Sequence, residues 1–183
     1  MSVQTIKKAE SSSVATKAFF VSLLWSLLGL LQANAQAPID QVALDNQKFL
    51  TVRDLVVVDC GSSIEGPLAL PSDIIAVGAE AFEGCYGLTS LTLSASLQQV
   101  GEGAFRGCYS LEKIQVENGN TFFRSSDGIL FSYDFQKIVR YPPVLLVPSF
   151  KIRNSVTHIG DDAFSGCREL KQVHIPESDT NAG

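Results

Sequence analysis

The sequence predicts an α/β solenoid, in which short parallel strands and short helical turns recur about every 23 residues. Three observations predict this fold class. A twelve-residue pattern occurs three times, and each copy continues into the same strand-like pattern. The composition, 45% hydrophobic and 18% charged, supplies enough apolar side chains for a core. A chain of 183 residues has room for one such domain and a leader, which excludes a large multidomain enzyme.

The first segment of the chain has the pattern of a secretory signal. Three lysines precede an apolar run over residues 18–31, which is followed by the small residues 33–35. The run has 14 residues, whereas spanning a bilayer takes roughly 20. We therefore predict a signal peptide over residues 1–35 and a secreted or cell-surface product with no membrane insertion after cleavage. An uncleaved N-terminal anchor or a buried helix is the alternative.

The twelve-residue pattern reads apolar-Gly-x-x-Ala-Phe-x-Gly-Cys-x-x-Leu. It covers residues 77–88, 100–111 and 159–170. Phe82 and Phe105 are 23 residues apart, whereas Phe105 and Phe164 are 59 apart, which is one period plus an insertion of 36. The Ala-Phe-x-Gly-Cys piece suits a short helical turn that ends at a glycine with positive φ. The three phenylalanine rings are expected to stack inside the solenoid, where neighbouring repeats bury what one repeat cannot.

Each copy continues into Leu-x-x-apolar-x-apolar, which is the strand signature of a leucine-rich repeat. Alternation along such a strand points its apolar residues inward and the intervening residues outward. The outward positions form a candidate protein-binding face, and a merely solvated strand face is the alternative. They are Ser90, Thr92, Lys113, Gln115, Gln172 and His174.

With its strands included, the repeat resembles the unit of the BspA-type leucine-rich repeat family, which is found in surface and secreted proteins of host-associated microbes. The resemblance covers about residues 68–176. We therefore predict a leucine-rich repeat domain over residues 68–183, after an N-terminal lead-in over residues 36–67 whose strand 55–59 opens the stack. The resemblance also implies attachment or recognition at a microbial cell surface, with host or extracellular-matrix proteins as the class of partner.

The insertion, assigned to residues 117–152, resembles a β-hairpin element of the same family. Two short strands are expected to project from the stack there before the next repeat begins. The linking turn, residues 133–136, lacks the glycine that such turns prefer. Tyr133 and Phe135 are further candidate protein-binding residues, because Tyr and Phe are typical of interface cores. The alternative is that these rings pack on the hairpin's own repeat.

The four cysteines are expected to be mostly buried free thiols. Cys85, Cys108 and Cys167 occupy the same position in successive repeats, where parallel Cβ directions oppose the dihedral angle of a disulfide. Cys60 lies outside that position and could pair with a neighbour. No C-x-x-C motif and no pair of histidines indicates a metal site, and no phosphate-binding loop indicates a cofactor.

The sequence shows no catalytic constellation. The only histidines, His158 and His174, are expected at the surface. A net charge of −5 without a basic cluster makes nucleic acid an unsuitable partner. We therefore predict no catalytic residue, no cofactor and no metal, and a protein as the ligand. An exported cysteine-dependent hydrolase, the third class considered, would need a thiol that alkylating reagents attack.

The sequence stops at Gly183, where another repeat would begin, and residues 178–183 are too small and polar to cover a core. An open repeat end exposes apolar side chains and invites pairing with another chain, and a shortened member of the family is the alternative explanation. The alternative function is therefore a structural or assembly module that forms a homo-oligomer through its C-terminal repeat end.

Overall fold

The computed structural model describes residues 41–176. The chain divides into the units Met1–Pro38 and Ile39–Gly183, and the second unit contains all of the described residues. The signal peptide expected over residues 1–35 lies outside them. Between residues 41 and 176, no helix is long and apolar enough to cross a membrane.

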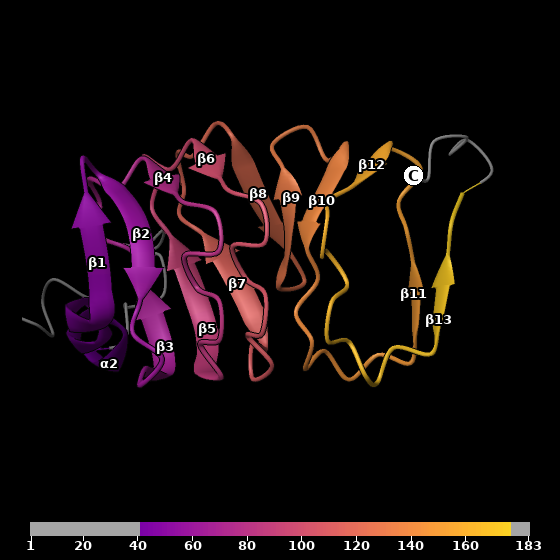
Figure 1. The fold of residues 1–183 in the computed structure, drawn as a ribbon. Coiled ribbons are helices and arrows are strands. Elements are labelled where there is room, and N and C mark those ends of the chain that lie inside the picture. The colour runs from indigo at the N-terminus through magenta and orange to yellow at the C-terminus, as the bar shows by residue number, and fades with distance from the viewer. Residues whose placement is uncertain (1–40, 177–183) are drawn as a thin grey trace, which may run out of the picture. The chain divides into compact units, whose positions relative to one another are not determined.

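A short helix, α2 (Gln41–Asp45), and a 3-10 turn, η1 (Asn46–Phe49), precede a series of short strands. The strands are β1 (Leu50–Arg53), β2 (Val56–Cys60), β3 (Glu65–Ala69), β4 (Ala76–Val77), β5 (Gly87–Leu93), β6 (Gln99–Val100), β7 (Lys113–Val116), β8 (Phe123–Ser126), β9 (Ile129–Ser132), β10 (Lys137–Arg140), β11 (Ser149–Lys151), β12 (His158–Ile159) and β13 (Gln172–His174). Figure 1 shows them following one another as successive coils.

Strands one period apart pair in parallel and in register. The strand order is β1-β2-β4-β6 on one side of the coils and β3-β5-β7 on the other. Leu68 pairs with Leu91 and Leu91 pairs with Ile114, so these two coils each advance by 23 residues. The predicted solenoid and its period are therefore confirmed.

The segment between the two strands of a coil is a pair of tight turns, where a short helical turn was expected. The amide of Ala81 donates to the carbonyl of Gly78, and the amide of Cys85 donates to the carbonyl of Phe82. The amide of Phe82 donates to the carbonyl of Ala104 in the next coil, at 2.9 Å. Because this amide bonds to the neighbouring coil, the segment cannot form the continuous i to i−4 bonds of an α-helix.

The interior of each inner coil is filled by the inward residues of the repeat. Phe82, Cys85 and Leu88 are fully buried, and the rings of Phe82 and Phe105 stack with their centroids 5.8 Å apart. The glycine before each repeat cysteine has the expected positive φ, for example 72° at Gly84. The stack predicted from the sequence exists for these two rings.

Side-chain amides from the N-terminal segment cap the first coil. β3 lies at the edge of its sheet, where an unpaired strand exposes its backbone groups. The side-chain amide of Asn46 donates to the carbonyls of Glu65 at 2.8 Å and Pro67 at 2.7 Å, and that of Gln47 donates to the carbonyl of Ala69 at 2.9 Å. The segment η1 therefore closes this end of the sheet.

The stretch expected as an insertion contains a further coil of the solenoid. β10 pairs in parallel with β12, and β11 pairs in parallel with β13. The ring of Tyr141 packs against that of Phe164 with 5.3 Å between centroids, so Tyr141 fills the phenylalanine position of this coil. Arg140 stands where the other coils have alanine, and no Gly-Cys pair follows. Because of these replacements, the coil does not match the repeat pattern.

The hairpin β8–β9 divides the solenoid into two stacks with separate cores. β9 pairs antiparallel with β8 and with β10, so it occupies the edge of β10 that would otherwise meet the preceding coil. The tip of the hairpin bonds to the free edge of β7, where the amide of Ile114 donates to the carbonyl of Gly128 at 2.8 Å. The first core contains Phe82 and the second contains Tyr141.

Candidate functional site

Four of the predicted outward residues lie side by side on β5 and β7. Parallel register places Ser90 beside Lys113 and Thr92 beside Gln115. The β7 residues are exposed and the β5 residues are half-buried. We call these four residues the outward strand face.

The other two predicted outward residues, Gln172 and His174, lie in a different sheet. β13 pairs with β11, and Nε2 of His174 lies 3.1 Å from Oγ of Ser149. The hairpin tip separates this sheet from β7, because it bonds to β7 on one side and accepts Arg153 on the other, with 2.6 Å between Nη2 of Arg153 and Oγ of Ser126. The six outward residues therefore form two groups.

The two binding residues predicted in the turn between β9 and β10 have different surroundings. The ring of Phe135 is partly buried, packs against the second core and lies 5.4 Å from the ring of Phe131. Tyr133 is 41% exposed, and Cζ of Arg124 lies 3.8 Å from the centroid of its ring. Tyr133 therefore presents an aromatic surface to solvent, whereas Phe135 contributes mainly to packing.

Sequence reasoning missed Arg124, although a signal for its position was present. Asp127 and Gly128 form a two-residue hairpin turn with φ values of 55° and 81°, as such turns require. The turn sets the register that pairs Arg124 with Phe131. Arg124 is thereby a diagonal neighbour of Tyr133, within reach of its long side chain.

A groove of about 380 Å³ lies beside Arg124 and Tyr133. Its other wall is formed by the end of β7 and the loop that follows it, residues 116–121. Asn120, which is 6% exposed, holds this loop to the preceding coil by donating to the carbonyl of Ser94 at 3.0 Å. The groove is therefore bounded by a strand pair and by an anchored loop.

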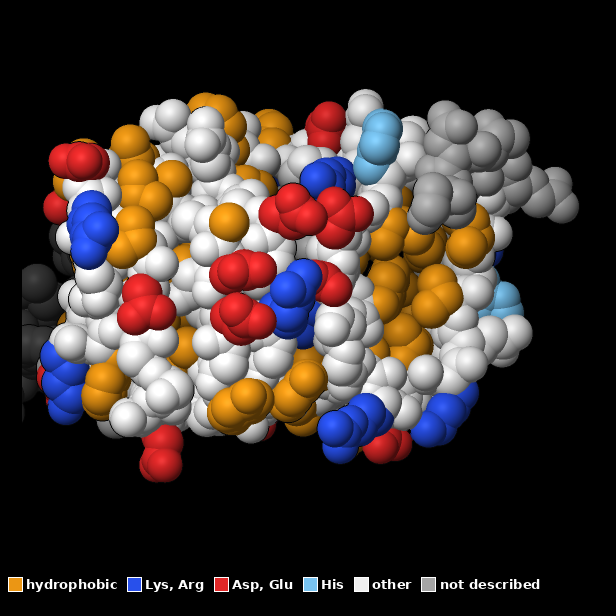
Figure 2. All heavy atoms as spheres, viewed as in Figure 1, with side chains coloured by type: hydrophobic (Ala, Val, Ile, Leu, Met, Phe, Trp, Pro, Cys, Tyr) orange, Lys and Arg blue, Asp and Glu red, His pale blue; other side chains and the backbone are white. Residues whose placement is uncertain are grey.

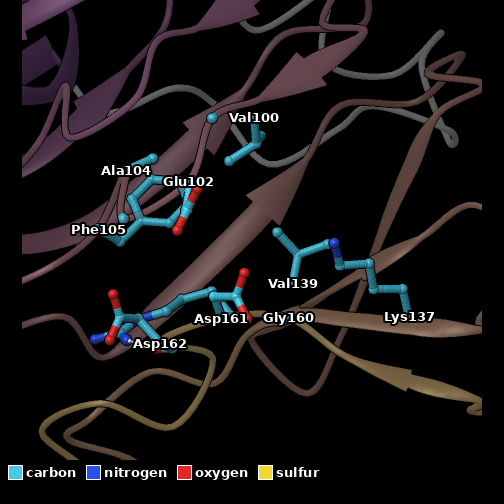
Figure 3. A pocket seen from close by; sticks show the side chains of 12 residues that line it. Val100, Glu102, Ala104, Phe105, Lys137, Val139, Gly160, Asp161 and Asp162 are labelled. Atoms are coloured by element: carbon cyan, nitrogen blue, oxygen red, sulfur yellow. Dashed lines mark hydrogen bonds between the residues drawn. The ribbon is translucent and has the colours of Figure 1, made fainter. Parts of the chain in front are cut away.

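A smaller cavity of about 150 Å³ lies at the boundary between the two stacks (Figure 3). Residues 100–105 form one wall, and the other wall is formed by Lys137, Val139, Arg140 and residues 160–162. The carboxylates of Glu102 and Asp161 project into it from opposite walls. In the part of the chain that the structure describes, no group of three His, Cys, Asp or Glu side chains is placed to hold a metal ion. We assign no chemistry to this cavity.

An exposed ion-pair cluster joins the two stacks beside the cavity. The guanidinium of Arg106 lies 2.9 Å from the carboxylate of Asp162 and 3.4 Å from that of Glu80. The hydrogen bond to Asp162 raises the pKa of Arg106. Figure 2 shows acidic side chains around a basic one in the middle of this face. Because the cluster is open to solvent, its contribution to stability is small.

The four cysteines are free thiols, as expected. Cys60, Cys85 and Cys108 are buried and Cys167 is half-buried. Sγ of Cys108 donates to the carbonyl of Phe82 at 3.1 Å, and burial raises the pKa of Cys108 to about 12. Since the thiolate is the nucleophile, this thiol is unreactive at neutral pH.

Cys108 is expected to resist alkylation in the folded protein. At pH 8, iodoacetamide should modify it at least roughly 100-fold more slowly than an unfolded control, because the thiolate is scarce and the side chain is buried. Peptide mapping by mass spectrometry, before and after unfolding in guanidinium chloride, measures the two rates. Equal rates would contradict the buried position of Cys108.

The paired strands, the repeat glycines and cysteines, and the stacked interior rings together define a leucine-rich repeat solenoid. Residues 60–136 and 145–183 match the sequence model of the BspA type leucine rich repeat region, with six copies. The chain belongs to the BspA-type leucine-rich repeat family, which confirms the resemblance seen in its motifs.

Solved bacterial structures share the fold. A leucine-rich repeat protein from Eubacterium ventriosum has a TM-score of 0.62 and 19% identity, over 66% of this chain and 32% of its own. The pneumococcal vaccine antigen PcpA has a TM-score of 0.51 and 21% identity, over 63% of this chain and 40% of its own. A leucine rich cell surface protein from Faecalibacterium prausnitzii has a TM-score of 0.51 and 23% identity, over 63% of this chain and 36% of its own. This chain thus spans 32–40% of the length of these relatives. A search of curated proteins found no match.

Proposed function

We propose that this protein is a non-enzymatic, secreted or cell-surface leucine-rich repeat protein that binds a protein ligand, with adhesion to host or extracellular-matrix proteins as its role. The observation that carries the proposal is the outward strand face, where a parallel sheet holds Ser90, Lys113, Thr92 and Gln115 in register. Repeat solenoids use such extended surfaces for binding. Two proteins that share the fold are a vaccine antigen and a cell surface protein, which supports an extracellular location.

The chemistry of the interior supports the non-enzymatic part of the proposal. Burial raises the pKa values of Cys108 and Cys167. Cys108 is buried and Cys167 is half-buried. The ring nitrogens of His158 and His174 lie within hydrogen-bond distance of the hydroxyl groups of Thr157 and Ser149. Within the described residues, these two histidines contact hydroxyl groups and no carboxylate that would orient the ring, which nucleophilic catalysis by a Ser–His pair also needs.

The proposal is tested by measuring binding of the purified protein to immobilised extracellular-matrix proteins by biolayer interferometry. The double variant Thr92→Arg/Gln115→Arg places two large cations on the outward strand face and should weaken binding at least tenfold. The double variant Ser96→Arg/Gln98→Arg adds the same charge to exposed residues of the loop after β5 and is the matched control. Binding to none of the proteins, or equal binding by both variants, would overturn the proposal.

A second function, self-association through the last described coil, is favoured by the apolar surface there. Ile159 is 36% exposed and Ile175 is 49% exposed, whereas Val77 and Leu93, at the same repeat positions of an inner coil, are 1% and 0% exposed. Apolar side chains are visible beside this coil, on the right of Figure 2. β13 also lies at the edge of its sheet, where a free strand can pair with another chain.

Light scattering over a concentration series tests this second function. The protein is expected to form a dimer at high concentration, and Ile175→Glu should return it to a monomer, because a carboxylate is costly to bury in an apolar interface. Leu44→Glu adds the same charge at an exposed apolar residue of α2 and should leave the dimer intact. A monomer at every concentration would exclude self-association.

A further inference from the structure

The turn between β9 and β10 holds a strained backbone in place. Phe135 has a φ of 58°, which is rare for a bulky residue because its Cβ crowds the backbone. The carboxylate of Asp134 accepts hydrogen bonds from Oγ of Ser132 at 2.6 Å and from the amide of Gln136 at 3.0 Å. Such over-determined strain occurs where a structure has to position a functional group. The neighbours of this turn therefore indicate what it positions.

The turn positions two aromatic rings against two arginines. Cζ of Arg153 lies 4.8 Å from the ring centroid of Phe135, and Cζ of Arg124 lies 5.6 Å from the same centroid. Cζ of Arg124 also lies 3.8 Å from the ring centroid of Tyr133. Stacking on aromatic rings limits the side-chain rotation of arginine while its N–H groups remain available at the edge of the plane.

Arg124 differs from the other arginines around the boundary of the two stacks. Arg106, Arg140 and Arg153 each donate to an oxygen atom of the protein. Within residues 41–176, the Arg124 guanidinium forms no hydrogen bond or ion pair, and its Cζ lies over the rings of Tyr133 and Phe135. A pre-oriented guanidinium that has no acceptor of its own can receive one from outside the protein.

The groove beside Arg124 suits a carboxylate next to an apolar group. The nearby carboxylates already have partners, since Glu117 accepts the amide of Ala95 at 3.1 Å and Asp134 holds the turn. The ring of Tyr133, which is 41% exposed, lies beside the guanidinium. The net charge of −5 opposes the approach of a polyanion, whereas a single carboxylate among apolar groups meets little repulsion.

We propose that Arg124 binds the carboxylate of an Asp or Glu side chain in a protein partner, with an apolar side chain of the partner against Tyr133. The planar guanidinium donates two parallel hydrogen bonds to the carboxylate, and the aromatic rings exclude water around them. The inference rests on the proposed function, protein binding. It specifies the segment of the partner that Arg124 recognises, which is an acidic residue beside an apolar one.

The test uses two immobilised peptide libraries with randomised flanking positions, one with Glu and one with Gln at the central position. The purified protein should be captured at least fivefold more by the Glu library, and the difference should decrease with rising salt. Arg124→Gln should abolish the difference, and Arg124→Lys should weaken it because an ammonium lacks the planar fork. Arg53→Gln, the same charge change at an exposed residue of β1, should leave it unchanged. Thermal unfolding of each variant checks that the fold is retained.

Equal capture by the two libraries, or capture by the Glu library that survives Arg124→Gln, would overturn the inference. Arg124-dependent binding to polygalacturonate in preference to the Glu library would also overturn it, since the partner would then be an acidic glycan. If Arg124→Gln leaves binding to the matrix proteins unchanged while the outward-face variant loses it, the inference fails and the proposed function stands. If the matrix proteins are not bound but the Glu library is, the proposed adhesion fails and the carboxylate site stands.

Discussion

Gly101→Ala is expected to destabilise the protein by about 3 kcal/mol, at the upper end of the cost of overpacking. A Cβ atom on Gly101 would lie 2.3 Å from the amide nitrogen of Ala79 and 2.5 Å from the carbonyl carbon of Gly78. Both are backbone atoms of the preceding coil and cannot rotate away as a side chain can. The two coils would have to separate, which disturbs the parallel pairing on both sides of the turn.

Urea unfolding followed by circular dichroism measures this effect. The expected loss corresponds to a fall in Tm of about 6–12 °C for a chain of this size. Gly61→Ala is the matched control, because the nearest atom to its added Cβ is 3.7 Å away and its φ is not positive. The control should remain within about 0.5 kcal/mol of the unchanged protein. Similar stability of the two variants would show that the coils are not in the close backbone contact described.

Arg140→Ala should produce the second large loss, about 2–4 kcal/mol, because it leaves two half-buried carbonyls without donors and opens a cavity. Arg140 is 2% exposed, and its guanidinium donates to the carbonyl of Asp162 at 2.5 Å and to that of Ser165 at 2.9 Å. Burial lowers the pKa of Arg140, but the group remains charged at neutral pH. It therefore acts as a bridge between the irregular coil and the last one.

Arg140→Met separates the two causes of this loss, which are the lost hydrogen bonds and the opened cavity. Methionine keeps most of the volume but donates no hydrogen bond, so its loss should be smaller than that of alanine and still measurable. Thermal unfolding of both variants, with the exposed Arg53→Ala as the control, gives the comparison. If Arg140→Met were as stable as the unchanged protein, the two carbonyl bonds would not contribute to stability. In that case the side chain would act by filling space alone.

Much of the regular fold could be predicted from the sequence because each repeat has the same surroundings as its neighbours. The period between Phe82 and Phe105 predicts the register that pairs Leu91 with Ile114, since identical units stack in phase. The same argument predicts the positions of the repeat cysteines and of the glycines before them. At Gly101, the repeat shows that a glycine is needed, and the structure gives the reason. The backbone of the preceding coil lies too close to leave room for a Cβ atom.

The candidate site could be predicted only in part. Periodicity placed Ser90, Lys113, Thr92 and Gln115 on one face, and the structure has them adjacent. It also placed Gln172 and His174 on that face, but they lie in a separate sheet. Arg124 could have been found from the Asp-Gly turn, which sets the hairpin register, although its contact with Tyr133 depends on side-chain packing.

The sequence by itself determined the repeat, its 23-residue period, the inward and outward faces of the strands and the family. Only the tertiary structure decided that Tyr141 and Arg140 belong to a further coil, and that the hairpin divides the stack into two cores. The physical reason is that a repeat encodes contacts between identical neighbours. The contacts of the hairpin with β7 and β10, and those of Arg140 with the last coil, are non-periodic and join residues that no local pattern relates.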